Sequence, residues 1–409
     1  DARVSSDEIH EWLLKGITDA GADVYDAGLC TTPMVYFGTA FYGFKASVQI
    51  TASHNPAEYN GMKVSRENAL PVGYDTGLGQ IKEWIEAGRE CPVAEKRGEV
   101  HQIDVRKDYL PFLLKYKEDW SGLKIAMDVS NGMASLFVHE IFGDEPAYIY
   151  DNMDGTFPNH EPNPLVPKNV VDLQKLVAAT KADIGIIFDG DADRVMFVDE
   201  NSRFISPDLM IAVLGHYFLE ERGEKGYIHQ DIRSSKAVGE YLAPMGGVMN
   251  TWRVGRAYAA LKLRELDGVY GGELAGHYYF RDFFYSDSGL LAAILIVNVA
   301  AKMKAQGVSL SQLIGRIEKY QNSGEINFRL EDKKGAMDAV RDYFMQKEKS
   351  TAYMDFDGYR VEFPDWWFNI RPSNTEPYLR FICEATTKEL LDEKVAKVRE
   401  ILTDQFGAK

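Results

Sequence analysis

The sequence predicts three α/β domains with mixed, largely parallel sheets, followed by a C-terminal α+β domain. Helix and strand patterns alternate through most of the chain, which is typical of α/β units. Near the C-terminus, several strand patterns follow one another and helical patterns flank them. With 409 residues, of which 45% are apolar and 26% charged, the chain is long enough for several globular domains.

The first domain is predicted at residues 1–100. Apolar residues in "DEIHEWLLKGITDAG" (7–21) recur at helical spacing, with Asp7 as a candidate N-terminal cap and Gly21 as a stop signal. Short apolar runs that end at turn residues predict strands. In chain order the other expected elements are a strand at 23–29, a helix at 33–43, a strand at 46–50 and a helix at 78–90.

Two further domains, at residues 101–205 and 206–322, are predicted by two more cycles of the same alternation. The first of them is expected to hold helices at 106–117, 132–143 and 170–181, and strands at 123–129, 147–151 and 183–188. The second is expected to hold helices at 207–222, 235–246, 256–266 and 290–301, and strands at 226–230, 248–254 and 268–273. The apolar stretch at 290–301 is too short to span a bilayer, so we interpret it as a buried helix.

The fourth domain is predicted at residues 323–409, where the pattern changes. Strands follow one another with few intervening helices, which favours an antiparallel sheet with helices on one face. The expected strands are 324–330, 351–363, 366–372 and 378–385, and the expected helices are 334–346 and 388–406.

Charge and cysteine content limit the class of protein. The net charge of −16 argues against a nucleic acid or an acidic membrane as the main partner. A site for an anionic substrate would need local cations, a metal or backbone N–H groups to overcome the repulsion from this net negative charge. The three cysteines have no metal-like or redox spacing, which favours reduced thiols in a cytoplasmic protein. No secretory signal peptide is visible, although the chain starts at Asp1 without a methionine.

Three aspartates follow directly after a buried strand in "IGIIFDGDADR". Asp189, Asp191 and Asp193 occupy alternate positions, so their carboxylates converge on one side of an extended chain. Three such charges are tolerable with a cation among them, and hard oxygen ligands suit Mg²⁺. A solvated turn or a calcium loop is the alternative, but strands flank this segment, whereas helices flank an EF-hand loop. We therefore predict a magnesium site here.

The loop "RPSNTEP" (371–377) joins two predicted strands. Arg371, Ser373, Asn374 and Thr375 offer one fixed charge and several hydroxyl or amide donors, and such a loop can wrap a phosphate. A plain hairpin turn explains the same residues equally well.

The loop "GGELAGH" (271–277) follows another predicted strand and contains Glu273 and His277. A glutamate can accept hydrogen bonds from two vicinal sugar hydroxyls. The alternative is a loop whose glycines permit only a tight turn.

Ser53 and His54 lie side by side in "ITASHNP" (50–56), at the end of a predicted strand. A hydrolase serine needs a base that faces it, and adjacent side chains on an extended strand point to opposite faces. His54 is therefore not expected to be the base for Ser53. Alone, the segment is explained by a polar turn.

Together "TASHNP", "DGDADR", "GGELAGH" and "RPSNTEP" resemble the motifs of the α-D-phosphohexomutases in order and spacing. The resemblance covers essentially the whole chain, with one motif in each predicted domain. The chain is similar in particular to the phosphomannomutase/phosphoglucomutase branch. "YGGELAGHYYFRDFFYSDSG" resembles that branch more than the phosphoglucosamine mutases, which usually carry Gly where Asn374 stands here.

This resemblance implies an isomerase with a phosphoserine at Ser53. It implies that the three aspartates and Ser53 bind one Mg²⁺ and that Arg194 supports the same phosphoryl group. Lys63, in "YNGMKV", matches the general acid/base, and a nearby metal and other cations are expected to lower its pKa toward neutrality. His54 is expected to assist. The implied reaction moves phosphate reversibly between the 1- and 6-positions of a hexose phosphate, mannose or glucose, through a hexose 1,6-bisphosphate.

The resemblance also implies a set of substrate-binding residues in the central active-site cleft. Glu273 would contact sugar hydroxyls, and the "RPSNTEP" residues would hold the non-reacting phosphate. The full set is Arg233, Arg256, Glu273, His277, Arg371, Ser373, Asn374 and Thr375. Three positions depart from the common pattern: Ala275 stands where Ser is usual, Arg256 where many relatives have His, and Arg233 where some have Lys.

Other expectations remain open from the sequence alone. "DARVS" resembles the end of a segment that normally follows a strand and a helix, so a few tens of preceding residues are expected to complete the first sheet. A phosphoglucosamine mutase, a metal-dependent phosphatase and a non-catalytic sugar-phosphate-binding protein are the alternative functions. We expect a monomer or weak dimer, with no nucleic-acid or membrane partner.

Overall fold

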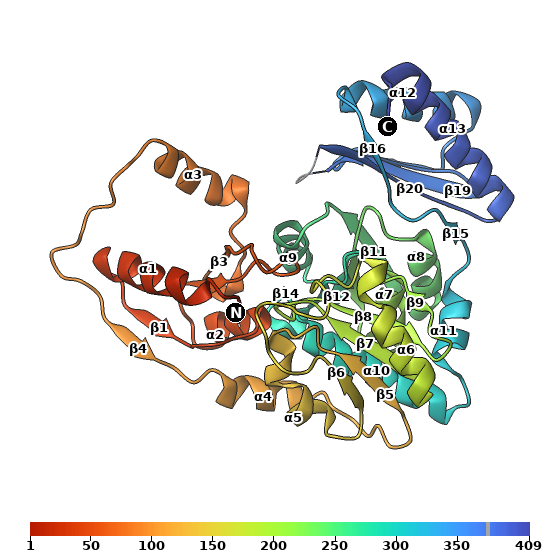
Figure 1. Ribbon diagram of the computed structural model, residues 1–409. Coiled ribbons are helices and arrows are strands. Elements are labelled where there is room, and N and C mark those ends of the chain that lie inside the picture. The colour runs from red at the N-terminus through yellow and green to blue at the C-terminus, as the bar shows by residue number, and fades with distance from the viewer. Residues whose placement is uncertain (374–376) are drawn as a thin grey trace.

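The computed structural model describes residues 1–373 and 377–409, and the chain folds into four successive units (Figure 1). In Figure 1 the first unit lies at the left in red and orange, the second and third form the centre, and the fourth stands above them in blue. The predicted fold, three α/β units with mixed sheets and a C-terminal unit with an antiparallel sheet, is confirmed.

The first unit has a short parallel strand pair, β1 with β4, and an antiparallel pair, β2 with β3. Its elements are α1 (Ser6–Asp19), β1 (Val24–Asp26), α2 (Thr32–Phe41), β2 (Ala46–Ile50), β3 (Met62–Arg66), α3 (Leu78–Glu86) and β4 (Val100–Gln102). The register of the second pair places Lys63 opposite Gln49, beside the segment that follows β2. β4 crosses the domain boundary predicted at residue 100. Asp7 was predicted as the N-terminal cap of the first helix, but Ser5 holds that position. Asp7 lies in the first turn, where its negative charge interacts favourably with the helix dipole.

The second unit contains a five-stranded sheet in the order β6-β5-β7-β8-β9. β5 pairs in parallel with β6 and β7, whereas β7–β8 and β8–β9 are antiparallel. Its elements are α4 (Arg106–Leu114), β5 (Ile125–Asp128), α5 (Val138–Phe142), β6 (Ala147–Ile149), α6 (Val171–Thr180), β7 (Ile184–Phe188), β8 (Val195–Asp199) and β9 (Phe204–Ile205). The helix predicted at 132–143 is broken into a 3₁₀ turn and the short α5.

The third unit has a second five-stranded sheet, in the order β11-β10-β12-β13-β14, again parallel on one side and antiparallel on the other. Its elements are α7 (Leu209–Gly215), β10 (Gly226–Asp231), α8 (Lys236–Leu242), β11 (Gly247–Trp252), α9 (Arg256–Glu265), β12 (Tyr270–Gly272), β13 (Tyr278–Phe280), β14 (Ser286–Asp287), α10 (Gly289–Ala305) and α11 (Leu310–Ile317). The helix predicted at 207–222 is α7 followed by a π-helical turn.

α10 is the central core helix, as its apolar sequence predicts, because most of its side chains are buried. Among residues 1–373 and 377–409, no single helix has the length and hydropathy needed to cross a membrane. α10 and α11 meet that criterion only when taken together, and a bend of 103° separates them.

The fourth unit is an antiparallel sheet covered on its outer face by two helices, α12 and α13 (Figure 1). Its elements are β15 (Gln321–Asn322), β16 (Ile326–Arg329), α12 (Lys333–Lys347), β17 (Ala352–Met354), β18 (Tyr359–Glu362), β19 (Trp366–Pro372), β20 (Tyr378–Ala385) and α13 (Lys388–Phe406). The strand predicted at 351–363 is the hairpin β17–β18, which turns at Gly358 with φ +67°.

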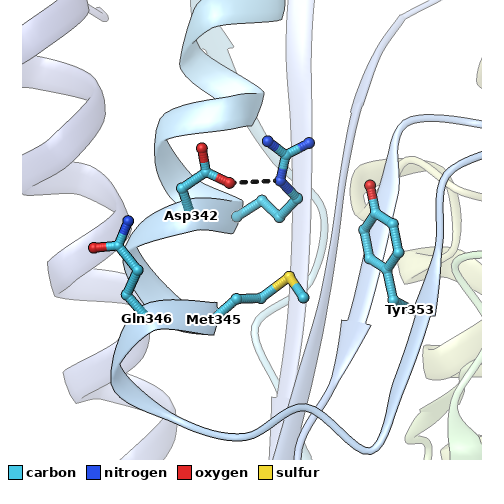
Figure 2. A pocket seen from close by; sticks show the side chains of 5 residues that line it. Asp342, Met345, Gln346 and Tyr353 are labelled. Carbon is cyan, nitrogen blue, oxygen red and sulfur yellow. Dashed lines mark hydrogen bonds and ion pairs between the residues drawn. The ribbon is translucent and has the colours of Figure 1, made fainter.

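A shallow hollow on the fourth unit lies between α12 and β17 (Figure 2). Asp342, Met345 and Gln346 line its helical side, and Tyr353 stands opposite them. None of the site residues predicted from the sequence lines this hollow.

The two largest hydrophobic cores of the described residues are separate from each other. One continuous core includes α2, the second sheet, the third sheet and α10, so it joins the first three units. The fourth unit has its own core of aromatic and aliphatic side chains. Its attachment to the third unit includes polar contacts: the Arg360 guanidinium donates to the carbonyls of Ile232 (2.9 Å) and Ser234 (2.6 Å). The fourth unit is therefore held against loops of the third partly by hydrogen bonds.

Candidate active site

Three of the four sequence motifs meet where strands of the first three units end. Ser53 follows β2, the "DGDADR" loop joins β7 to β8, and "GGELAGH" joins β12 to β13. An isolated antiparallel bridge pairs Arg194 with His277, and the Ser53 hydroxyl reaches the "DGDADR" loop. The convergence is a property of the fold, because these segments lie far apart in the sequence.

Ser53 is held in an unusual backbone conformation. Its φ of +52° lies in the left-handed region, which non-glycine residues adopt at a cost. The backbone N–H of Ser53 donates to Thr51 Oγ1 (2.9 Å), and its own Oγ donates to Asp189 Oδ2 (2.9 Å). The side chain is nearly buried. The loop thus presents one hydroxyl directly to the acidic cluster.

Arg3 anchors the loop that carries Ser53, and nothing in the local sequence pattern marked this residue. Its guanidinium donates to four backbone carbonyls, those of Ser53 (2.8 Å), Asn55 (2.7 Å), Pro56 (2.7 Å) and Tyr59 (3.0 Å). Arg3 is 2% exposed. A buried guanidinium shared by four carbonyls fixes the course of the loop, because hydrogen bonds to a charged donor are strong.

Asp189, Asp191 and Asp193 form a compact, fully buried cluster, in which one carboxylate oxygen from each lies within 4.8 Å of the others. Asp191 Oδ1 and Asp193 Oδ1 have no hydrogen-bond partner among the described residues. Burial, together with the charges of Asp191 and Asp193, holds the pKa of Asp189 well above its usual range. Converging oxygens that lack donors fit a hard divalent cation, so these three residues could hold a metal.

Lys63 reaches the same cluster from β3. Its ammonium lies 2.7 Å from Asp191 Oδ2 and 2.5 Å from Asp193 Oδ2. Burial alone would lower the pKa of Lys63, but the two carboxylates outweigh burial and hold it well above its usual range. In this arrangement the nearest charges are anions. The expectation that a metal and other cations lower the pKa of Lys63 toward neutrality stays a prediction for the metal-bound site.

His54 lies close enough to Arg194 for the positive charge of Arg194 to act on its imidazole. The Arg194 cation, assisted by burial, lowers the pKa of His54 to about 3. His54 is therefore neutral near pH 7. Its Nδ1 has no partner within the described parts of the chain. The expectation that His54 assists stays a prediction, and the assistance would come from a neutral imidazole.

A chain of four charged or polar side chains links the second and third units. Arg194 Nε donates to His277 Nε2 (2.9 Å), and the other ring nitrogen of His277 lies 2.7 Å from Asp287 Oδ2. Arg256 Nε donates to the second oxygen of Asp287 (2.9 Å). Asp287 was quoted in the sequence pattern but was not singled out as a site residue. Arg256 Nη2 is buried without a hydrogen-bond partner among the described residues, and the guanidinium lies over the Tyr36 ring, 3.7 Å from its centroid.

Glu273 already accepts two hydrogen bonds from the protein. Its Oε2 accepts from the backbone N–H of Gly255 (3.1 Å) and its Oε1 from the Tyr279 hydroxyl (2.5 Å). Burial raises its pKa. The predicted contacts of Glu273 with sugar hydroxyls would use the remaining lone pair of each oxygen.

Two further predicted cations are held by carboxylates near the boundary between the third and fourth units. Arg233 pairs with Asp231 (Nη2 to Oδ2, 2.8 Å), directly after β10. Arg371 pairs with Asp357 (Nε to Oδ1, 3.0 Å), whose other oxygen accepts from the backbone N–H of Val254 (2.8 Å). Asp357 therefore connects the predicted phosphate loop of the fourth unit to the third unit.

The remaining residues of the "RPSNTEP" loop are placed only in part. The backbone N–H of Ser373 donates to the carbonyl of Tyr378 (2.9 Å). Asn374 and Thr375, which were predicted to bind phosphate, lie outside the described residues.

Comparison with known proteins identifies relatives over nearly the full length of the chain. Family models described as phosphoglucomutase/phosphomannomutase alpha/beta/alpha domains I, II and III match residues 1–90, 107–202 and 206–320. The model for the C-terminal domain of the same family matches residues 325–401.

Individual relatives agree with these matches. A phosphomannomutase of Salmonella montevideo is 37% identical over 96% of this chain and 89% of its own length. A protein of Xanthomonas campestris named phosphohexose mutases is 35% identical over 98% of this chain and 90% of its own. A crystal structure of a phosphoglucomutase/phosphomannomutase family protein from Burkholderia thailandensis, 28% identical, superposes with a TM-score of 0.86 and covers 98% of this chain and 87% of that one.

Proposed function

The chain belongs to the phosphoglucomutase/phosphomannomutase family, and on that premise we propose that it interconverts mannose 6-phosphate and mannose 1-phosphate, with glucose phosphates as further substrates. The observation that carries this proposal is the 2.9 Å contact between the Ser53 hydroxyl and Asp189 at the edge of a buried cluster of three carboxylates. A serine in such surroundings suits phosphoryl transfer, because the cluster can hold a cation beside its phosphate.

The proposed cycle has two transfers. The Oγ–P bond of phosphorylated Ser53 breaks as the phosphorus bonds to the free 1- or 6-hydroxyl of the sugar, which gives a hexose 1,6-bisphosphate. The bisphosphate then turns over, and its other phosphate returns to Ser53 Oγ. We propose Lys63 as the group that takes up and returns the hydroxyl proton. To accept a proton, Lys63 must first leave Asp191 and Asp193 and lose its own.

We propose that Asp189, Asp191, Asp193 and Ser53 hold one Mg²⁺. The two carboxylate oxygens without donors among the described residues support this assignment. When bound, the ion would reduce the repulsion between the phosphoryl group and the incoming hydroxyl.

The remaining site residues would bind and orient the substrate. We propose that Arg256, through its unpartnered Nη2, and Arg371 attract the phosphates, against a net charge of −16 for the whole chain. Glu273 would accept hydrogen bonds from the sugar hydroxyls. The two phosphate ends must fit the same loops in turn, so both orientations of the bisphosphate must be accommodated.

The central experiment combines intact-mass analysis with mutase assays. We expect a phosphate adduct on Ser53, and loss of both the adduct and mutase activity in Ser53→Ala. Ser65→Ala is a matched control, since Ser65 is also buried, lies on neighbouring β3, and its Oγ has no partner among the described residues. A normal mutase rate in Ser53→Ala would refute the proposal.

Substrate comparison separates the alternative functions. Mannose, glucose and glucosamine phosphates are assayed side by side, with the matching hexose 1,6-bisphosphate as activator. Preference for glucosamine phosphate would indicate a phosphoglucosamine mutase instead. Net phosphate release that needs no bisphosphate would indicate a phosphatase, and binding without turnover would indicate a non-catalytic sugar-phosphate-binding protein.

A further inference from the structure

One fully buried carboxylate holds two of the predicted substrate residues at once. Asp287 lies on β14, is 0% exposed, and uses a different oxygen for each partner. Oδ1 accepts from Arg256 Nε at 2.9 Å, and Oδ2 lies 2.7 Å from His277 Nδ1. These partners come from separate elements, because Arg256 begins α9 and His277 precedes β13.

The partners of His277 determine where its ring proton lies. Arg194 Nε–H can only donate, so His277 Nε2, 2.9 Å away, must be the acceptor and carries no proton. A neutral imidazole then carries its proton on Nδ1 and donates it to Asp287. The hydrogen-bond network therefore assigns the Nδ1–H tautomer.

We propose that Asp287 is a positioning residue of this active site. It fixes the tautomer of His277, and through His277 it fixes the guanidinium of Arg194, while its second oxygen fixes Arg256. This inference rests on the proposed function, in which Arg194 supports the phosphoryl group on Ser53. One buried acid would thus align a cation beside the reacting phosphate with a cation that receives the substrate.

A shared metal ion is the competing explanation for this group of side chains. Asp193, His277 and Asp287 have ligand atoms within 4.8 Å of one another. However, both oxygens of Asp287 already face N–H donors, and each ring nitrogen of His277 already has a partner. The geometry of Asp287 is that of an acceptor for two donors.

Asp287→Asn tests the proposal because the amide has nearly the same shape but only one acceptor. If its NH₂ faces Arg256, two donors oppose each other. If it faces His277, the ring proton must move to Nε2, where it opposes the Arg194 donor. Either outcome disturbs the chain, so we expect kcat to fall on the order of 100-fold or more, as when an orienting aspartate is lost from a histidine. KM is expected to change less, since both arginines keep their charge.

Nitrogen NMR of protein labelled with ¹⁵N-histidine gives a readout that a purely structural role would not move. In the wild type, His277 is expected to show an unprotonated Nε2 and a protonated Nδ1, with the signals assigned by their loss in His277→Gln. Asp287→Asn is expected to shift the protonation toward Nε2 or to mix the tautomers. Asp128→Asn is a matched control, because Asp128 is also fully buried and lies 3.0 Å from a histidine, His160. It should leave the His277 signals in place.

Two results would overturn the proposal: a protonated Nε2 in the wild type, or an Asp287→Asn variant with unchanged His277 signals and unchanged kcat. Failure of the proposed function is distinguishable from either. A wild type without mutase activity would refute the function, whereas the tautomer measurement would still report on Asp287.

Discussion

Glu384 is predicted to make the stability of the fourth unit depend on pH near neutrality. Its side chain is 4% exposed on β20 and connects three parts of the chain. It accepts from Ser235 Oγ (2.7 Å) at the start of α8, from Asn322 Nδ2 (2.9 Å) on β15, and from Trp367 Nε1 (2.8 Å) on β19. Burial, and then the nearby charge of Asp208, raise the pKa of Glu384 from 4.5 to about 7.

The sign and size of the effect follow from proton linkage. Because the folded state holds the proton of Glu384 more tightly than the unfolded state, the contribution of this group to stability is fully present below pH 4.5 and is lost as the pH rises through about 7. Each tenfold difference in proton affinity is worth about 1.4 kcal/mol. The loss from this carboxyl group therefore amounts to about 2 to 3 kcal/mol between roughly pH 5 and pH 8.

Glu384→Gln removes the titration while keeping the shape of the side chain. Urea unfolding of the fourth unit, followed by tryptophan fluorescence, is measured for wild type and variant across this pH range. We expect the variant to gain about 2 to 3 kcal/mol relative to wild type between roughly pH 5 and pH 8, whatever its stability at pH 5. Exposed Glu331→Gln is the control. A difference between Glu384→Gln and wild type that does not change with pH would refute the reasoning.

Three further predictions concern the reaction centre. Gly190→Ala places a Cβ 2.5 Å from the carbonyl oxygen of Ser53, so steady-state assays are expected to show kcat lower by at least about tenfold. Gly16→Ala is the control, because its added Cβ has no atom within 4 Å, and it should leave the rates unchanged. In Arg3→Lys the ammonium cannot donate to all four carbonyls, so urea unfolding should show a free energy of unfolding lower by about 2 kcal/mol or more. An unchanged free energy of unfolding would contradict the anchoring role of Arg3. Removal of divalent metal with a chelator should abolish mutase activity, and added Mg²⁺ should restore it. Asp191→Asn should raise the Mg²⁺ concentration for half-maximal rate on the order of 10-fold or more. Mutase activity that does not change with the chelator would exclude the metal.

Elements governed by local pattern were predicted well from the sequence. The strand at 46–50 and the helix at 388–406 have the predicted bounds, because each is a simple apolar pattern bounded by clear signals. The helix predicted at 207–222 changes into a π-helical turn, and the strand predicted at 351–363 reverses at a glycine. The short strands β13 and β14 were missed, since their pairing with β12 and with each other is decided by tertiary contacts.

The candidate site shows the same division. The four motifs could be read from residue types and spacing, and three of them meet in the fold. Arg3 could not be found that way, because all four of its carbonyl partners lie about fifty residues away in the chain. The contact of Lys63 with Asp191 and Asp193 could not be predicted either, because the sequence does not reveal the β2–β3 register that brings its ammonium to these carboxylates.

The separation of the two hydrophobic cores has a consequence for how the molecule responds to damage. A cavity made in α2 or α10 is expected to weaken the first three units together, because their side chains belong to one continuous core. A cavity under α12 or α13 would weaken only the fourth unit, and deuterium exchange would accelerate there while the rest of the chain stays protected. Variants in the last quarter of the chain would thus disturb the unit that carries the predicted phosphate loop and leave the first three units stable.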